Sequence, residues 1–184
     1  HTSPPVRCFC EDEDGNILIG TKGSGIKLLN PATKELTDYL NESKGLISNS
    51  VYALRRNKAN DIFIGTEGTG INILNAATGR LEKLEIPDKY PPFKAVYNIY
   101  FTNNDSLLWV GTSGYGLIKI NISREQGRYH VKGFRQYNSS DKNISLNNDV
   151  VYAITSDPEN NMLWFGTRGG GLNCINMKDN SIKS

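Results

Sequence analysis

The sequence has little of what several common classes of protein require. None of its apolar runs, in 184 residues, is long enough to cross a bilayer, so we expect no membrane contact by this segment. The 21 basic and 19 acidic residues leave a net charge of only +2. Because no basic stripe is present either, nucleic acid is not an expected partner. No segment has a convincing 3.6-residue apolar period, which argues against a helical protein.

Cysteine and histidine are also scarce. Cys8, Cys10 and Cys174 cannot all pair within one chain, and the two histidines have no ligand-like spacing to them. We therefore expect buried free thiols, no metal site and no other cofactor. Phosphate-binding loops are excluded because a strand, and not a helix, follows each group of glycines.

Glycine, in contrast, is abundant, and most of the 18 glycines lie in four copies of one sequence motif. The copies are Ile19-Gly20-Thr21-Lys22-Gly23-Ser24-Gly25-Ile26, Ile64-Gly65-Thr66-Glu67-Gly68-Thr69-Gly70-Ile71, Val110-Gly111-Thr112-Ser113-Gly114-Tyr115-Gly116-Leu117 and Phe165-Gly166-Thr167-Arg168-Gly169-Gly170-Gly171-Leu172. Self-similarity with a period of about 45 residues is typical of repeat architectures. The glycines fit a tight turn in which positive φ and close approach exclude a Cβ atom.

The sequence around each copy of this motif predicts four short antiparallel strands. A strand-like segment precedes each copy: Val51-Tyr52-Ala53-Leu54, Val96-Tyr97-Asn98-Ile99, Val151-Tyr152-Ala153-Ile154 and, as a degenerate first copy, Val6-Arg7-Cys8-Phe9. Polar turns such as Asp14-Gly15 separate the first and second strands. This is the period of a β-propeller blade. The sequence therefore predicts an all-β fold, with residues 1–184 forming a single partial β-propeller whose blades span approximately 6–40, 46–84, 92–137 and 146–184.

The repeat resembles the two-component regulator propeller repeat. Gly45-Leu46-Ile47-Ser48-Asn49-Ser50-Val51-Tyr52 matches the first half of that pattern, and the segment from Leu163 to Leu172 matches the second half. The first copy departs from the pattern with Arg7 in place of tyrosine. The third departs with Pro91-Pro92-Phe93 in its lead-in.

The resemblance implies a setting and a function. Such repeats form the periplasmic sensor of hybrid two-component histidine kinases, typical of gut Bacteroides that detect breakdown products of complex glycans. Their propellers usually have seven blades, so the resemblance implies a fragment. It also implies a non-catalytic module that recognises an oligosaccharide and signals to a kinase outside this segment.

Two other function classes stay open. One is a protein-interaction scaffold, and the other, less favoured, is a propeller glycosidase or lyase. Glycoside hydrolysis needs two carboxylates that face each other across the substrate. Only Glu67 and Asp149 are available on the expected binding face, and they belong to different blades.

Antiparallel connectivity predicts where a ligand would bind. The turn between the second and third strands and the loop between blades share one end of each blade, and binding residues often lie on such loops. The candidate ligand contacts are Lys22, Asn49, Glu67, Tyr115, Asp149 and Arg168. Tyr115 and Arg168 are the strongest of these candidates, because glycan recognition favours an aromatic ring beside charged hydrogen-bonding side chains. Tyr52, Tyr97 and Tyr152 recur at one strand position and are expected to pack.

An arc of four blades would leave two apolar blade faces and their strand edges without a neighbour. The four blades could close on themselves, or two chains could pair about a twofold axis and complete an eight-bladed ring. We expect a homodimer, because the blade wedge of this family suits more than four blades.

Overall fold

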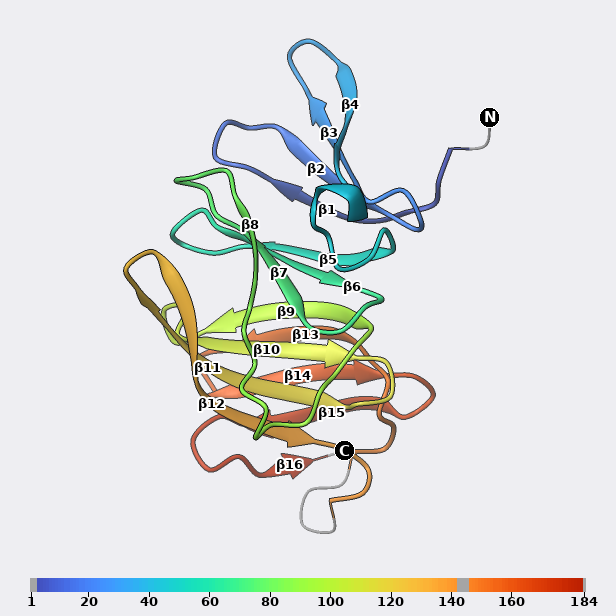
Figure 1. Cartoon of the computed structure of the whole chain (residues 1–184). Helices are drawn as coiled ribbons and strands as arrows, with labels where there is room; N and C mark the ends of the chain where they lie inside the picture. The colour runs from blue at the N-terminus through green and yellow to red at the C-terminus, as the bar shows by residue number, and fades with distance from the viewer. Residues whose placement is uncertain (1–2, 142–145, 184) are drawn as a thin grey trace. The chain divides into compact units, whose positions relative to one another are not determined.

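The computed structural model describes residues 3–141 and 146–183. Within these residues the chain forms sixteen β-strands and no α-helix (Figure 1). The strands make four antiparallel sheets, and in each sheet four consecutive strands lie side by side in chain order. The predicted all-β fold of four-stranded repeats is confirmed.

Each sheet is one blade. The first blade contains β1 (Val6–Glu11), β2 (Ile17–Thr21), β3 (Ile26–Asn30) and β4 (Glu35–Leu40). After the 3-10 helix η1 (Glu42–Lys44), the second blade contains β5 (Val51–Arg56), β6 (Ile62–Thr66), β7 (Ile71–Leu74) and β8 (Leu81–Lys83). The third contains β9 (Val96–Thr102), β10 (Leu107–Thr112), β11 (Leu117–Glu125) and β12 (Arg128–Tyr137). The fourth contains β13 (Val151–Asp157), β14 (Met162–Thr167), β15 (Gly171–Asn176) and β16 (Ile182–Lys183).

The chain divides into two compact units, His1–Val96 and Tyr97–Ser184. The core of the first unit lies between its two blades. It contains Leu18, Ile26, Leu46, Val51, Leu54, Ile62, Ile64 and Leu74. Each of these side chains stabilises the fold by roughly 1.5–3 kcal/mol when fully buried, because its apolar surface leaves water.

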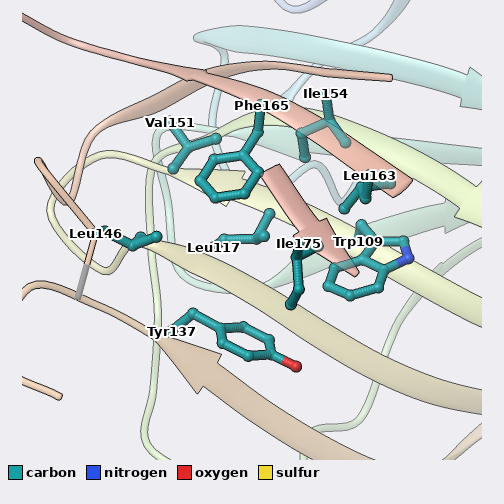
Figure 2. Packing of buried hydrophobic residues seen from close by; sticks show 9 residues of the cluster. All are labelled: Trp109, Leu117, Tyr137, Leu146, Val151, Ile154, Leu163, Phe165 and Ile175. Atoms are coloured by element: carbon teal, nitrogen blue, oxygen red, sulfur yellow. The ribbon is translucent and has the colours of Figure 1, made fainter. Parts of the chain in front are cut away.

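The second unit has an equivalent core between its own two blades (Figure 2). It contains Trp109, Leu117, Tyr137, Leu146, Val151, Ile154, Leu163, Phe165 and Ile175. The rings of Trp109 and Tyr137 stack with their centroids 6.2 Å apart. Alternate residues of β14 point to this core, as the burial of Leu163 and Phe165 on either side of half-buried Trp164 shows.

The hairpin of β11 and β12 is the longest in the chain as described, with strands of 9 and 10 residues. Its outer end carries an ion pair in which Lys132 Nζ lies 2.7 Å from Glu125 Oε1. This extension lies between the third and fourth Gly-Thr pairs, and so accounts for their wider separation in the sequence.

Two of the recurring first-strand tyrosines pack beside each other, although one of them, Tyr152, is 49% exposed. Within the second unit the rings of Tyr97 and Tyr152 stack with centroids 5.3 Å apart. Within the first unit Arg7 occupies the tyrosine position, and its guanidinium lies 5.8 Å from the centre of the Tyr52 ring. A cation thus replaces an aromatic ring without losing the contact.

Candidate functional site

The Gly-Thr-x-Gly-x-Gly motif forms the turn between the second and third strands of each blade. Thr112 closes this turn: its Oγ1 donates to Gly116 O at 2.8 Å and accepts from Tyr115 N at 3.1 Å. Thr21 makes the same bond to Gly25 O at 2.8 Å. Gly116 has φ +73° and lies directly against the backbone carbonyl of Tyr137, where a Cβ atom would collide. The backbone conformation and the close packing of the turn therefore require the glycines of this motif.

The turn of one blade is bonded to the loop that leads into the next. Gly23 N and Gly25 N both donate to the Asn49 carbonyl, at 3.0 and 2.8 Å. In the second unit Gly114 N and Gly116 N donate to the Asp149 carbonyl, both at 2.9 Å. The prediction that these two kinds of loop share one end of the blade is confirmed.

Three of the predicted residues lie together in the first unit. Lys22 forms an isolated β-bridge with Ser50, and Glu67 N donates to Ser50 O at 2.9 Å. Asn49 precedes Ser50, so the chain itself connects the three positions. The side chains of Lys22 and Glu67 are exposed and carry opposite charges. The Asn49 amide is half-buried, and its Oδ1 accepts from Glu42 N at 2.8 Å.

The other three lie together in the second unit. Arg168 N donates to Val150 O at 2.9 Å, and Val150 also forms a β-bridge with Ser113, two residues before Tyr115. The Tyr115 ring is half-buried, whereas Arg168 is exposed. This arrangement offers a ring and a guanidinium on adjacent turns of one end.

Asp149 already has partners within the chain. Its two carboxylate oxygens accept from Ser139 N at 2.6 Å and from Ser139 Oγ at 2.7 Å. Asn49 has the same relation to Glu42, since Asn49 N also donates to Glu42 Oε1 at 2.8 Å. Both residues therefore hold an interblade loop in place, a role that sequence reasoning did not give them.

The structure also shows a pocket of about 320 Å³ at the turn end of the second blade. Its walls are Thr69, Gly70, Lys83, Leu84, Glu85, Ile86, Asp88, Tyr90, Pro92 and Phe93. Phe93 is buried, and its carbonyl accepts from Gly70 N at 3.0 Å, which fixes the loop against the turn. Lys83, Glu85 and Asp88 are exposed charges at this pocket.

Sequence reasoning missed this pocket. The available signal was the replacement of the asparagine-containing lead-in by Pro91-Pro92-Phe93. Two prolines fix φ and favour an extended path, which carries the loop away from the usual course before Phe93 returns to the blade. The departure from the repeat pattern was visible in the sequence, but the existence of the pocket depends on the three-dimensional path of the loop.

A smaller hollow of about 120 Å³ lies at the opposite end of the first unit, and Asp12, Asn60 and Tyr39 are among its lining residues. The Asp12 carboxylate closes its own hairpin turn, accepting from Asp14 N at 3.0 Å and from Asn16 N at 2.8 Å. The polar turn predicted at Asp14-Gly15 is therefore confirmed. Burial raises the pKa of the Tyr39 phenol, and the nearby Asp12 charge adds to this rise.

The thiols are free in the part of the chain that the structure describes. Cys174 is buried, and Cys8 and Cys10 are half-buried on the side of β1 that packs on the core. Burial raises the pKa of the Cys8 thiol to about 12, and the neighbouring Cys10 adds to this. Residues 3–141 and 146–183 include no group of three or more His, Cys, Asp or Glu side chains placed to hold a metal ion.

Two segments of the sequence match a known family. The family described as two component regulator propeller matches residues 2–23 and 145–169, at the beginning of the first and fourth repeats. These two segments are similar to two component regulator propeller repeats. A curated relative, histidine kinase P4 of Formosa agariphila, is 28% identical over 171 residues. The match covers 90% of this chain but only 12% of that relative.

Solved structures share the fold of this chain. The extracellular domain of BT3049 from B. thetaiotaomicron, named as a hybrid two component system, matches all of this chain and 29% of its own, with TM-score 0.58 and 17% identity. Virginiamycin B lyase from Staphylococcus aureus matches 100% of this chain and 56% of its own, with TM-score 0.66 and 16% identity. At these identities the likeness shows the β-propeller fold. Among the described residues, no helix is long and apolar enough to span a bilayer.

Proposed function

We propose that this chain is a ligand-sensing segment of the periplasmic part of a hybrid two-component histidine kinase, and that it recognises an oligosaccharide. The observation that carries the proposal is the pair of regulator propeller repeats at residues 2–23 and 145–169. The relation to a histidine kinase over 90% of the chain supports the same setting. The segment itself binds, and the phosphotransfer chemistry belongs to other parts of the protein.

The pocket of the second blade is our first choice for the ligand contact. Its volume of about 320 Å³ lies at the lower end of the range for small-molecule sites, roughly 300–1,000 Å³. Sugar hydroxyls need hydrogen-bond partners, which the Glu85 and Asp88 carboxylates and the Thr69 hydroxyl offer. Tyr90 adds a ring whose apolar surface suits a sugar face. In the second unit, Tyr115 and Arg168 supply the same combination of a ring and a charged donor.

Signalling requires a ligand that prefers one arrangement of the sensor. A sugar that binds equally well to both arrangements does not shift the equilibrium between them, whatever its affinity. The interblade loop of residues 85–93 fits this requirement, because it lines the pocket and leads directly into β9. A ligand that binds one conformation of this loop better than another would act on the segment that leads into β9.

Titration calorimetry of the purified chain with a panel of neutral and acidic oligosaccharides tests the proposal. We expect at least one to bind, and Glu85→Gln combined with Asp88→Asn to weaken binding about tenfold or more, because hydrogen bonds to charged groups contribute about 1.5–3 kcal/mol each. Glu159→Gln, an exposed change in the turn between β13 and β14, is the matched control and should bind like the wild type.

A second pair of variants locates the contact. Loss of binding in Tyr115→Ala with Arg168→Gln, and not in the Glu85 and Asp88 variant, would move the site to the second unit. Failure of the wild type to bind any oligosaccharide, together with specific capture of a protein, would overturn the proposal in favour of an interaction scaffold.

A further inference from the structure

The long hairpin of β11 and β12 concentrates positive charge. From Leu117 to Tyr137 it contains five lysine and arginine residues and a single acidic residue, Glu125. The whole chain has 21 basic and 19 acidic residues, so the rest of the chain is slightly acidic on balance. Leu107, at the start of β10, pairs with Asn121, and the hairpin therefore extends beyond β10 as a two-stranded ribbon (Figure 1).

Strand pairing brings most of this charge to one face of the hairpin. Residues paired across two strands point to the same side, as do alternate residues along one strand. The pairs on this face are Lys119 with Arg135, Asn121 with Gly133, Ser123 with His130 and Glu125 with Arg128. Lys132 belongs to the same face, because its Nζ lies 2.7 Å from Glu125 Oε1. The basic face defined here consists of Lys119, Arg128, His130, Lys132 and Arg135. No basic stripe is visible in the sequence, because both strands contribute these residues.

The basic face points toward the fourth blade. Lys119 pairs with Trp109, which lies in the core between the third and fourth blades. The Nζ of Lys119 donates to Asn180 Oδ1, in the turn between β15 and β16, at 2.8 Å. All of these residues belong to the second unit, so the direction of the face is defined within that unit. The opposite face of the hairpin carries the buried side chains of Ile118, Ile120 and Ile122.

Two arginines of the basic face lack an acidic partner. Arg128 and Arg135 are exposed, and among the described residues neither forms an ion pair. Glu125 is already bonded, since it accepts from Lys132 Nζ at 2.7 Å and from Ser123 Oγ at 2.8 Å. The face therefore keeps a net positive charge that ions or a ligand from the solvent must balance.

Lys119 and Arg135 form the inner end of the face. Burial lowers the pKa of the Lys119 ammonium, and the neighbouring Arg135 charge lowers it further. The Arg135 guanidinium lies 4.9 Å from the centre of the Tyr137 ring, so an aromatic surface supports it from one side. An anionic group bound between the two cations would offset their repulsion.

The shape and the sign of the face favour a single anionic chain. β12 is the outer strand of its sheet, and charges on such a strand prevent pairing with other chains, but either sign serves that purpose. The turn at Gln126 and Gly127 carries no apolar side chain that could enter a bilayer. From Lys119 to Glu125 the ribbon is about 20 Å long, at roughly 3.3 Å per residue, and only two strands wide.

We propose that the basic face binds an acidic oligosaccharide, one whose sugars carry carboxylate or sulfate groups. Arg128, Lys132 and Arg135 contact the anionic groups through charge-assisted hydrogen bonds. The exposed Asn121 amide and the Ser123 hydroxyl offer partners for the sugar hydroxyls.

This inference rests on the proposed function, because it takes from it that the ligand is an oligosaccharide. It adds a contact separate from the pocket of the second blade, which belongs to the first unit. The carboxylates of Glu85 and Asp88 would repel the anionic groups that the basic face attracts, so the two places select sugars of different charge.

Fluorescence anisotropy with labelled oligogalacturonate and labelled dextran sulfate tests the proposal, and uncharged dextran is the neutral probe. The wild type should bind both charged probes, more weakly as salt is added, and should not bind dextran. Arg128→Gln combined with Arg135→Gln should weaken binding about tenfold, with an unchanged circular dichroism spectrum. Lys34→Gln combined with Arg80→Gln removes the same charge from exposed positions of the first unit and should bind like the wild type.

Undiminished binding by the Arg128 and Arg135 variant would overturn the proposal, and so would a wild type that binds neither charged probe. In both cases the proposed function still stands if a neutral oligosaccharide binds and the Glu85 and Asp88 variant weakens it. Equally tight binding to single-stranded DNA or to phosphatidylglycerol vesicles would also count against the proposal, because the face would then attract anions without selecting a sugar chain.

Discussion

At the scale of single residues, the importance of a glycine in this chain depends on what faces it. Gly111 and Gly133 both belong to strands of the third blade, and neither requires a positive φ. A Cβ atom on Gly111 would lie 2.8 Å from Val151 O, whereas one on Gly133 would lie 3.4 Å from the nearest atoms of Asn121. The first distance is a collision and the second is ordinary contact.

Gly111→Ala should therefore lower the free energy of unfolding by about 1–3 kcal/mol, because overpacking forces the neighbouring strand to move. Chemical denaturation of the wild type and the variant measures this. Gly133→Ala is the matched control, and it should stay within about 0.5 kcal/mol of the wild type or be slightly more stable. A Gly111→Ala variant as stable as Gly133→Ala and the wild type would show that the collision at Gly111 is relieved at no cost.

At the scale of elements, interblade loops are held by polar side chains as well as by backbone bonds. Asp149 bonds the Ser139 amide and hydroxyl and, through its own carbonyl, the two glycine amides of the preceding turn. One residue thus ties together the start of β13, the end of β12 and the turn between β10 and β11.

Asp149→Ala should lower the free energy of unfolding by about 1.5–3 kcal/mol, since it removes hydrogen bonds to a charged group. Ser139→Ala removes only the hydroxyl partner and should cost less. Thermal or denaturant unfolding gives both values. A fully stable Asp149→Ala variant would mean that the backbone bonds hold the loop alone, and would restore Asp149 as a candidate for ligand contact.

The elements show what the sequence could predict and what it could not. The turn at Thr112 was predictable, because glycine spacing and the threonine hydroxyl act within a few residues of each other. The pocket lined by Glu85 and Asp88 was not, because it exists only where the loop before β9 lies against the second blade. The side-chain partners of Asn49 and Asp149 escaped for a related reason: they depend on the three-dimensional path of loops that the repeat pattern leaves variable.

At the scale of the whole molecule, stability should fall in alkaline solution partly through Cys8. Its pKa is raised from 9.0 to about 12 in the folded chain by burial. Between these values the unfolded chain loses the thiol proton while the folded chain keeps it. The free energy of unfolding therefore decreases as the pH rises, by at most about 1.4 kcal/mol for each pH unit.

Denaturant unfolding of the wild type and Cys8→Ala at a series of pH values measures this contribution. The two curves should have the same slope below the ordinary thiol pKa of 9.0, and the wild type should lose stability faster above it. Parallel curves over the whole range would show that the Cys8 thiol ionises as readily in the folded chain as in the unfolded one.

The glycine–valine contact has a consequence for how such chains arise. Gly20, Gly65 and Gly111 each face the valine that begins the first strand of the next repeat, namely Val51, Val96 and Val151. The same pair of residue types therefore recurs at each of these three contacts. Duplication or loss of a repeat-length stretch of DNA would leave each remaining glycine facing a valine. The number of repeats can therefore change during evolution without a new interface, while the loops at the ends of the blades diversify independently.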